Sequence, residues 1–221
     1  MEKIEKQFLV AGLGEFGQNL AITLESLGCD VIAIDSDENI VQSLSQDLTY
    51  VVCGNAADEK TLKAMGADQV DVAIIGIDNL QVSVLATLIL KEFGVPTIVA
   101  KATNDLHGKT LEKIGADVII YPQRDIARRL AYRLFSERVL DYTELSDNTA
   151  IINMEVVPQF IGKNLIELNL RKKFNLNVIS IQRNGVSIVN PDAHEVFQEG
   201  DRMQLFGTAY SLERFRLDLM K

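Results

Sequence analysis

Several residue types on which common activities depend are scarce in this sequence. Among 221 residues there are no tryptophans, two histidines and two cysteines. Cys29 and Cys53 lack a CxxC or metal-ligand spacing, so we interpret them as small core residues in a reducing cytosol. No Ser-His-Asp order, HExxH motif or Cys/His metal cluster is present, and His107 is interpreted as a helix-start residue. The sequence therefore indicates neither a metal site nor one of these hydrolases.

Excess positive charge and long apolar runs are also missing. The formal net charge is -9, whereas nucleic-acid binders are usually basic, so no nucleic-acid partner is expected. No basic-then-apolar signal segment opens the chain, and no apolar stretch approaches the ~18 residues that suggest a membrane span. These absences predict a soluble cytoplasmic chain, although its partner can still be a membrane protein.

Short apolar segments alternate with helical patterns along the first 140 residues. Continuous apolar strands separated by helices are typical of a parallel sheet covered on both faces. The predicted fold class is therefore α/β, a Rossmann-like doubly wound parallel sheet. The predicted strands are Gln7–Ala11, Val31–Ile34, Tyr50–Cys53, Val72–Ile77, Thr97–Lys101 and Val118–Tyr121. The predicted helices between them are Gln18–Leu27, Glu38–Leu48, Asp58–Met65, Asn79–Phe93 and Gly108–Ile114.

A long helix over Gln123–Val139 follows the sixth strand, and a small α+β domain follows the helix. Asn184-Gly185 between two strand patterns is a strong hairpin signal. The predicted domains are residues 1–140, including the long helix, and residues 141–221, with a linker near Leu140–Asn148. The second domain is predicted to contain strands Ala150–Val157, Asn177–Gln182, Val186–Val189 and Arg202–Phe206, and a terminal helix Ser211–Met220.

A glycine-rich turn follows the first strand and opens a helix. Gly12–Gly17 (GLGEFG) fits GxGxxG in the strand-turn-helix context that a dinucleotide site requires, with helix-start N–H groups facing the phosphates. Asp35 ends the second strand, where a carboxylate accepts hydrogen bonds from ribose hydroxyls and disfavours the 2′-phosphate of NADP. The alternative interpretation is a glycine turn with no ligand.

Other strand ends meet the same crevice, because ligands of open parallel sheets lie outside the carboxyl ends of the strands. Asn55 is a candidate for an adenine edge, and Lys101 for phosphate charge. The alternatives are a loop polar residue for Asn55, a surface lysine for Lys101, and a helix cap for Asn79. The predicted nucleotide site comprises Gly12, Leu13, Gly14, Glu15, Phe16, Gly17, Asp35, Ser36, Asn55, Ala56, Ile77, Asp78, Asn79 and Lys101.

The ordered set of segments resembles the RCK (KTN) family, with TrkA-N and TrkA-C (RCK_C) domains, which regulates K⁺ conductance in Ktr/Trk uptake systems and gated potassium channels. The resemblance implies a nucleotide-binding gating subunit rather than an enzyme. It also implies an integral-membrane potassium-translocating partner at the inner face of the cell membrane. The matching segments are Gly12–Gly17, Val31–Asp35, Leu85–Pro96, Val99–Ala102, Leu111–Asp117, Gly162-Lys163, Leu168–Val178 and Gln198–Gly207.

The same resemblance implies how copies of the chain assemble. Gln123–Val139 would be a crossover helix that reaches a partner subunit, with the stripe Ile126, Leu130 and Leu134 buried between them. The homodimers would assemble into an octameric ring. The alternative is a helix folded back on its own sheet, with its arginines as a solvated face.

Two residues depart from the pattern of Ktr-type relatives. Glu15 stands where an arginine commonly reaches a neighbour's nucleotide phosphate, and Gln123 stands where a glutamate often binds a cation. A carboxylate beside a triphosphate is unfavourable. Among adenine nucleotides, these changes favour NAD(H), ADP or AMP over ATP, and no metal ligand is assigned.

The resemblance further implies cyclic di-AMP as a second ligand, at the dimer interface of the C-terminal domain. Arg171 would meet a phosphate, and Asn177 an adenine or ribose. The alternative is that these are hairpin polar residues and core aliphatics. The positions near the family's pattern are Leu165, Ile166, Arg171, Asn177, Pro191 and His194.

Two other functions stay open from the sequence. An NAD-dependent oxidoreductase would need an acid/base residue in a substrate domain, and His194 is the one obvious candidate. A redox-sensing Rossmann transcription factor would need a basic DNA-reading element. Six residues precede the first strand, and we expect them to leave no room for a winged helix.

Overall fold

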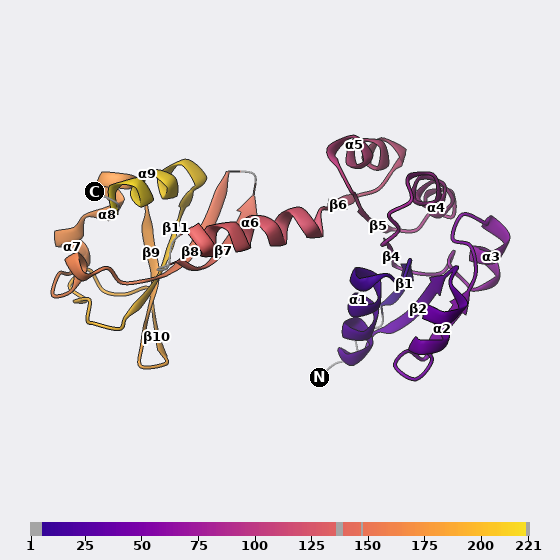
Figure 1. The fold of residues 1–221 in the computed structure, drawn as a ribbon, viewed down its shortest axis with the longest axis horizontal. Coiled ribbons are helices and arrows are strands. Elements are labelled where there is room, and N and C mark those ends of the chain that lie inside the picture. The colour runs from indigo at the N-terminus through magenta and orange to yellow at the C-terminus, as the bar shows by residue number, and fades with distance from the viewer. Residues whose placement is uncertain (1–5, 136–138, 147, 220–221) are drawn as a thin grey trace. The chain divides into compact units, whose positions relative to one another are not determined.

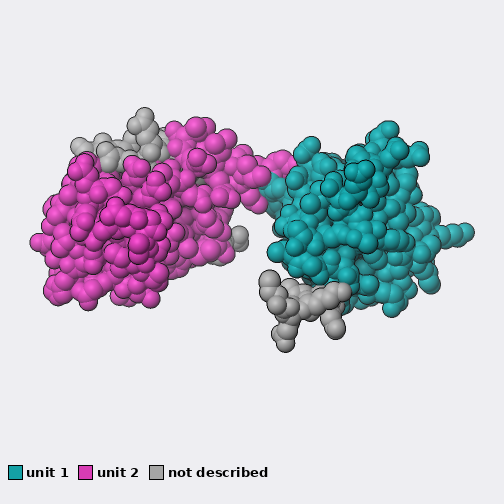
Figure 2. Space-filling view, turned by 90° about the horizontal axis from the view of Figure 1, so that it is seen from below, with its two compact units in different colours: residues 1–122 teal, residues 123–221 magenta. Residues whose placement is uncertain are grey.

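The computed structural model describes residues 6–135, 139–146 and 148–219. They form two compact units, the first ending at Pro122 and the second beginning at Gln123 (Figure 2). The sequence-based boundary at residue 140 differs from this division, because two ion pairs join helix α6 (Pro122–Phe135) to strand β7 (Val139–Ser146). Arg129 lies 3.0 Å from Asp141, and Arg128 forms a second ion pair, with Glu144.

The first unit is a six-stranded sheet with the order β3-β2-β1-β4-β5-β6 (Figure 1). Every pairing is parallel, which confirms the doubly wound prediction. The strand order reverses beside β1, and ligands bind at such a switch point in open α/β sheets. The strands are β1 (Gln7–Ala11), β2 (Asp30–Asp35), β3 (Tyr50–Cys53), β4 (Val72–Ile75), β5 (Thr97–Lys101) and β6 (Val118–Ile120).

Short polar side chains start four helices of this unit. The side chains of Asp37, Asp58, Asn79 and Asn104 each accept a hydrogen bond from a backbone N–H in the first turn of their helix, which satisfies a donor that the helix leaves free. The cap at Asn104 explains why α5 starts before the predicted Gly108. The helices are α1 (Glu15–Ser26), α2 (Glu38–Leu44), α3 (Glu59–Ala64), α4 (Leu80–Glu92) and α5 (Asp105–Ile114).

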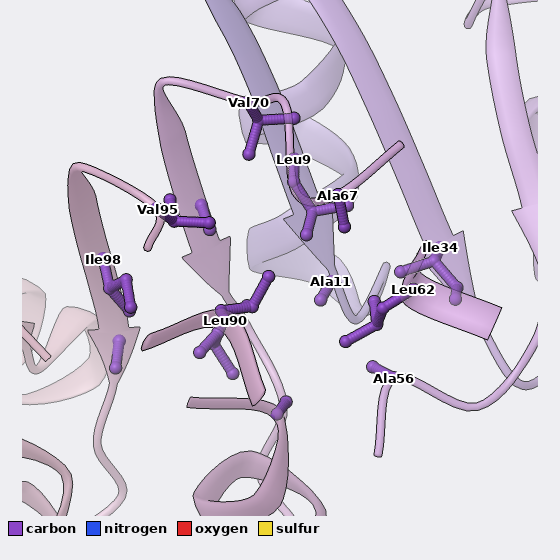
Figure 3. Close-up of a cluster of buried hydrophobic side chains, with 14 of the residues drawn as sticks. Leu9, Ala11, Ile34, Ala56, Leu62, Ala67, Val70, Leu90, Val95 and Ile98 are labelled. Carbon is purple, nitrogen blue, oxygen red and sulfur yellow. The ribbon is translucent and has the colours of Figure 1, made fainter. Parts of the chain in front are cut away.

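Apolar side chains cover both faces of the sheet, as β1 illustrates. Leu9 and Ala11 belong to one buried cluster, with Leu62 of α3 and Leu90 of α4 (Figure 3). Val10 points to the opposite face and belongs to a second cluster, with residues of α1 and α2. A strand that is buried on both faces needs an apolar residue at every position. This requirement explains the continuous apolar runs in the sequence.

The second unit has an antiparallel sheet with the order β10-β9-β11-β8-β7, which confirms a small α+β domain. Asn184 and Gly185 have φ of 51° and 80°, as a tight hairpin turn requires. Besides β7, its elements are β8 (Thr149–Glu155), η1 (Pro158–Phe160), α7 (Leu165–Leu168), α8 (Leu170–Phe174), β9 (Asn177–Arg183), β10 (Val186–Val189), β11 (Arg202–Thr208) and α9 (Ala209–Leu219).

The predicted linker near Leu140–Asn148 is wrong, because most of it is strand β7. Val139 and Tyr142 are buried in the core of the second unit, and β7 pairs with β8 along its length. The predicted long helix ends earlier than expected for the same reason, since Val139 begins this strand. Residues 136–138 of the predicted helix lie outside the described residues.

A buried ion pair ties several segments of the second unit together. The Asp201 carboxylate accepts hydrogen bonds from Arg183 Nε at 2.9 Å and Nη2 at 2.8 Å, and from the backbone N–H of Gln198 at 2.8 Å. Arg183 also donates to Glu195 and to the carbonyl of Val196. Burial alone would raise the pKa of Asp201, but these hydrogen bonds hold that pKa below its usual value. The loop after β10 is therefore anchored to β9.

Replacing Asp201 with alanine should destabilise the second unit. The Arg183 side chain is 21% exposed and would lose its fully buried partner. We expect the free energy of unfolding, measured with urea, to fall by about 3 kcal/mol, the lower end for a broken buried pair, because Glu195 still contacts Arg183. The exposed neighbour Glu199 is the control, and Glu199→Ala should change the free energy of unfolding by less than about 0.5 kcal/mol.

Acid should remove the same stabilisation. Since the pKa of Asp201 is lower in the folded state, its contribution is fully present above the unfolded pKa of about 4 and is lost as the pH falls through the folded value. The difference in unfolding free energy between wild type and Asp201→Ala should therefore shrink below about pH 4. A difference that is constant across this range would contradict the assignment.

Candidate nucleotide-binding site

A crevice lies at the carboxyl ends of strands β1 to β4. Its volume is about 420 Å³, and its residues follow four different strands at the point where the sheet order reverses. Chain segments far apart in sequence therefore meet where the fold class predicts a ligand. The lining residues are Gly12, Gly14, Ile34, Asp35, Ser36, Ile40, Gly54, Asn55, Ala56, Gly76, Ile77, Asp78, Asn79 and Val82.

The glycines of the first turn differ in what they permit. Gly12 has φ of +89°, a conformation that side chains disfavour. A Cβ at Gly17 would lie 1.9 Å from the carbonyl oxygen of Gly12, so any side chain there would push α1 off β1. A Cβ at Gly14 would meet nothing within 4 Å. Because Gly14 lines the crevice, its open surface lets a ligand approach the backbone at the start of α1.

Asp35 connects this turn to the start of α2. Its Oδ2 accepts a hydrogen bond from the Leu13 N–H at 2.6 Å, and its Oδ1 accepts one from the Asp37 N–H at 2.9 Å. Each carboxylate oxygen has a second lone-pair direction, which remains for a hydroxyl donor in the crevice. The Leu13 side chain is buried, so Leu13 shapes the turn from behind instead of lining the crevice.

Four other predicted residues are absent from the crevice lining. Glu15 is exposed in the first turn of α1, Phe16 packs against the core between α1, α2 and the sheet, and Gly17 is buried against Gly12. Lys101 is 5% exposed, and its ammonium group lies 2.9 Å from the Asp78 carboxylate. The surface-lysine alternative is therefore wrong for Lys101. Lys101 is connected with the crevice through its ion pair with Asp78, which lines it.

Two polar side chains of the crevice also accept hydrogen bonds from nearby backbone N–H groups. Asn79 Oδ1 accepts a hydrogen bond from the Val82 N–H at 3.0 Å and caps α4, as the alternative interpretation predicted. Asn55 Oδ1 accepts one from the Ala57 N–H at 2.9 Å. Both side chains lie in the lining, so their cap and turn roles fix them at the crevice.

The predicted site lacked five residues of the lining, which are Ile34, Ile40, Gly54, Gly76 and Val82. Gly54 and Gly76 directly follow strand ends, and their position is the signal that could have found them. Ile40 and Val82 lie in the first turns of α2 and α4, the helices that begin at the crevice. Since they carry no chemical group that distinguishes them from core residues, the sequence pattern alone does not separate them from the core.

The charge of the crevice is acidic. Asp35 and Asp78 are the charged side chains in its lining, as far as the described residues go. A phosphate group would therefore be held mainly by backbone N–H groups at the start of the twelve-residue helix α1. Such a site suits a ligand with hydroxyl groups and few negative charges better than one with many.

His107 stabilises the interior beside this site. Its Nδ1 accepts a hydrogen bond from the Thr103 N–H at 3.3 Å, so its Nε2 carries the proton and donates to Ser83 Oγ at 2.8 Å. Burial lowers the pKa of His107, while the charge of Asp78 opposes this shift. His107 is thus a neutral residue that joins α5 to α4. Its backbone N–H bonds to Asn104, which confirms the helix-start interpretation.

The predicted cyclic di-AMP residues lie on several elements of the second unit. Leu165 and Ile166 are in α7, Arg171 is in α8, and Asn177 begins β9. Pro191 and His194 are in the loop after β10, and this loop reaches α7 through a hydrogen bond from the Ile166 N–H to Ala193 O at 3.3 Å. All six residues are exposed or half-buried, and the ligand stays a prediction.

Membrane spans and metal clusters are both missing from the described residues. None of their helices is both long and apolar enough to cross a membrane. They also contain no cluster of three or more His, Cys, Asp or Glu side chains arranged to hold a metal ion.

Comparison with known proteins gives matches along nearly the whole chain. The TrkA-N domain matches residues 8–122, and the TrkA-C domain matches residues 155–219. Ktr system potassium uptake protein C of Bacillus subtilis (strain 168) is 40% identical over 213 residues, 96% of each chain. Ktr system potassium uptake protein A of the same organism is 36% identical over 211 residues, 95% of each chain.

A solved structure of the GsuK channel bound to NAD has the same fold, with a TM-score of 0.64 at 20% sequence identity. The alignment covers 96% of this chain and 39% of the channel chain. The two family domains and the relatives above 30% identity show that the chain belongs to the family of potassium-uptake proteins built from a TrkA-N and a TrkA-C domain.

Proposed function

We propose that this chain is the nucleotide-binding regulatory subunit of a potassium uptake system and gates an integral-membrane potassium-translocating subunit. The observation that carries the proposal is the 40% identity to Ktr system potassium uptake protein C across 96% of both chains. A regulatory subunit with this task acts at the inner face of the cell membrane, bound to its translocating partner. It carries out no chemical reaction.

The crevice at the ends of β1 to β4 supports an adenine nucleotide as the ligand. Asp35 offers acceptor positions to ribose hydroxyls, the open backbone at Gly14 offers N–H groups to phosphates, and Asn55 lies on the β3 side for the base. The acidic lining, with Asp35 and Asp78, favours NAD(H), ADP or AMP over ATP. The sequence predicted the same preference from Glu15, which lies outside the lining.

Helix α6 supports contacts between copies of the chain. Its residues Ile126, Leu130 and Leu134 follow one another at intervals of four and are 64%, 49% and 77% exposed. Three neighbouring apolar side chains on one helix face are a feature of protein interfaces. We propose that a second copy covers this stripe, and that such dimers form an octameric ring. Cyclic di-AMP at the C-terminal domain is a separate prediction.

Ligand binding regulates a partner only if two conformations bind the ligand unequally. A hundredfold difference in affinity supplies about 2.7 kcal/mol per site. Several equivalent sites in one ring would add their contributions. A few nucleotides would then be enough to move a pore between two states.

Asp35→Ala should weaken nucleotide binding. The substitution removes a charge-assisted hydrogen bond to ribose, so we expect the affinity for ADP or NAD to fall by about 1.5–3 kcal/mol in titration calorimetry. Asp35→Asn keeps an acceptor oxygen for the Leu13 N–H and should give a smaller loss. The control is Asp47→Ala, in the loop between α2 and β3 that enters the amino end of β3, whereas the crevice lies at the carboxyl ends of the strands. Equal affinities for all four proteins would contradict the assignment.

Leu130→Glu should separate the copies of the chain. A charge without a partner in an apolar interface is costly, so the mass from light scattering should drop toward that of a monomer. The matched control is Asp125→Lys, a charge change on the side of α6 away from the stripe. If both variants keep the wild-type mass, α6 does not carry the contact.

The gating function is tested by potassium flux. We expect liposomes that contain the translocating subunit and this chain to show flux that differs among NADH, ADP, ATP and no nucleotide. Asp35→Ala should lose most of this response at nucleotide concentrations that saturate wild type. Identical flux under all conditions, with nucleotide binding intact, would leave a static scaffold as the better description.

A further inference from the structure

An ion pair between a buried lysine and an exposed carboxylate lies at the crevice. Lys101 Nζ lies 2.9 Å from Asp78 Oδ1, and the two side chains are 6% and 63% exposed, respectively. The ammonium group is therefore enclosed in protein, whereas the carboxylate lines the crevice. An enclosed ammonium needs a charged partner close by. Lys101 therefore holds Asp78 from the interior side and leaves the carboxylate open to a ligand.

Both members of the pair are fixed by their backbone. Asp78 directly precedes Asn79, whose side chain caps α4. Lys101 is the last residue of β5 and pairs with Ile120 of β6. The nearby His107 is neutral, because its Nδ1 accepts a hydrogen bond. Lys101 thus supplies the positive charge at this point and holds the Asp78 carboxylate at the crevice.

The strand order places Asp35 and Asp78 on opposite sides of the glycine turn. The order β2-β1-β4-β5 puts the glycine turn after β1 in the middle, with Asp35 at the end of β2 on one side and Asp78 after β4 on the other. A diphosphate held by the N–H groups at this turn would have a carboxylate on each side. Under the proposed function, Asp35 takes the ribose of adenosine. Asp78 then meets the group attached to the far phosphate of the diphosphate.

The group attached to the far phosphate differs between nucleotides. In a dinucleotide it is a second ribose, whose hydroxyls donate hydrogen bonds to a carboxylate. In adenosine triphosphate it is a third phosphate, whose negative charge a carboxylate repels at short range. Among the described residues, no lysine or arginine belongs to the lining, so no side-chain cation offsets that repulsion. The nearby Lys101 ammonium is enclosed and already paired with Asp78.

We propose that Asp78 is a specificity-determining residue that selects a dinucleotide with two riboses over adenosine triphosphate, and that Lys101 is the positioning residue that holds it. This inference rests on the proposed binding of an adenine nucleotide in the crevice. It gives Lys101 a different task from the direct phosphate contact that its position in the sequence suggested.

The test of Asp78 is a comparison of affinities for NAD and ATP by titration calorimetry. Wild type should bind NAD more tightly than ATP. In Asp78→Asn, the loss of a charge-assisted hydrogen bond and of the repulsion should lower the ratio of NAD affinity to ATP affinity by roughly 10- to 100-fold. An unchanged ratio would overturn the inference. If Asp78→Asn does not fold, the double variant Asp78→Asn/Lys101→Met, which removes both charges, is used for the same measurement.

The test of Lys101 is a double-mutant cycle. A positioning residue acts through Asp78, so Lys101→Met should weaken NAD binding by about tenfold in the wild-type background and have little effect in Asp78→Asn. A direct phosphate contact would instead give the same loss in both backgrounds and would overturn the positioning role. The matched control is Lys91→Met, from the half-exposed pair with Asp117 at 3.5 Å. It should leave both affinities unchanged.

The two levels of the proposal fail in different ways. If wild type binds neither nucleotide, or if Asp35→Ala has no effect on binding, the proposed nucleotide site itself is wrong. If wild type binds NAD and Asp35→Ala weakens it, but Asp78→Asn leaves the NAD to ATP ratio unchanged, the site stands and the selection by Asp78 is wrong.

Discussion

The carbonyl oxygen of Gly12 is the point where three segments of the first unit meet. A Cβ at Gly17 would lie 1.9 Å from it, and a Cβ at Gly76 would lie 2.9 Å from it. The start of α1 and the end of β4 therefore approach the first turn more closely than side chains allow. This approach puts the backbone N–H groups of α1, the end of β4 and the Asp35 carboxylate around one crevice. A side chain at Gly17 would open that arrangement, and the site would lose its shape before any ligand contact changed.

Charge gives this crevice its chemical preference. Its lining carries the carboxylates of Asp35 and Asp78, while the nearest enclosed cation, Lys101, is paired behind it. Backbone dipoles at the start of α1 favour an anion, but two carboxylates limit how much negative charge the crevice accepts. Under the proposed function, this site would suit a phosphate group flanked by hydroxyls. For a regulatory subunit, such a preference makes the charge of the ligand the property that a gating conformation can detect.

Local patterns predicted most of the fold, for identifiable reasons. The central strands β1 and β5 are largely apolar because the sheet is covered on both faces, and both have the bounds expected from the sequence. The edge strand β3 also has the predicted bounds, although its residues are half-buried or exposed. The hairpin at Asn184 and Gly185 followed from their tolerance of positive φ. The strand β7 was missed, because the apolar residues of Val139–Ser146 neither alternate regularly nor form a continuous run, and the segment takes its strand form from pairing with β8. The start of α5 was misplaced because the cap at Asn104 was not recognised.

The sequence by itself determined the glycine turn, the position of Asp35 and the order of strands and helices, because these depend on neighbouring residues and on period. Only the tertiary structure decided which way Lys101 points. Lys101 and Asp78 end different segments of the chain, and they meet because β4 and β5 are adjacent in the sheet. The same holds for Ile40 and Val82, which line the crevice from two helices. A side chain's direction and partner depend on which strands lie next to each other, and residues distant in the sequence decide that.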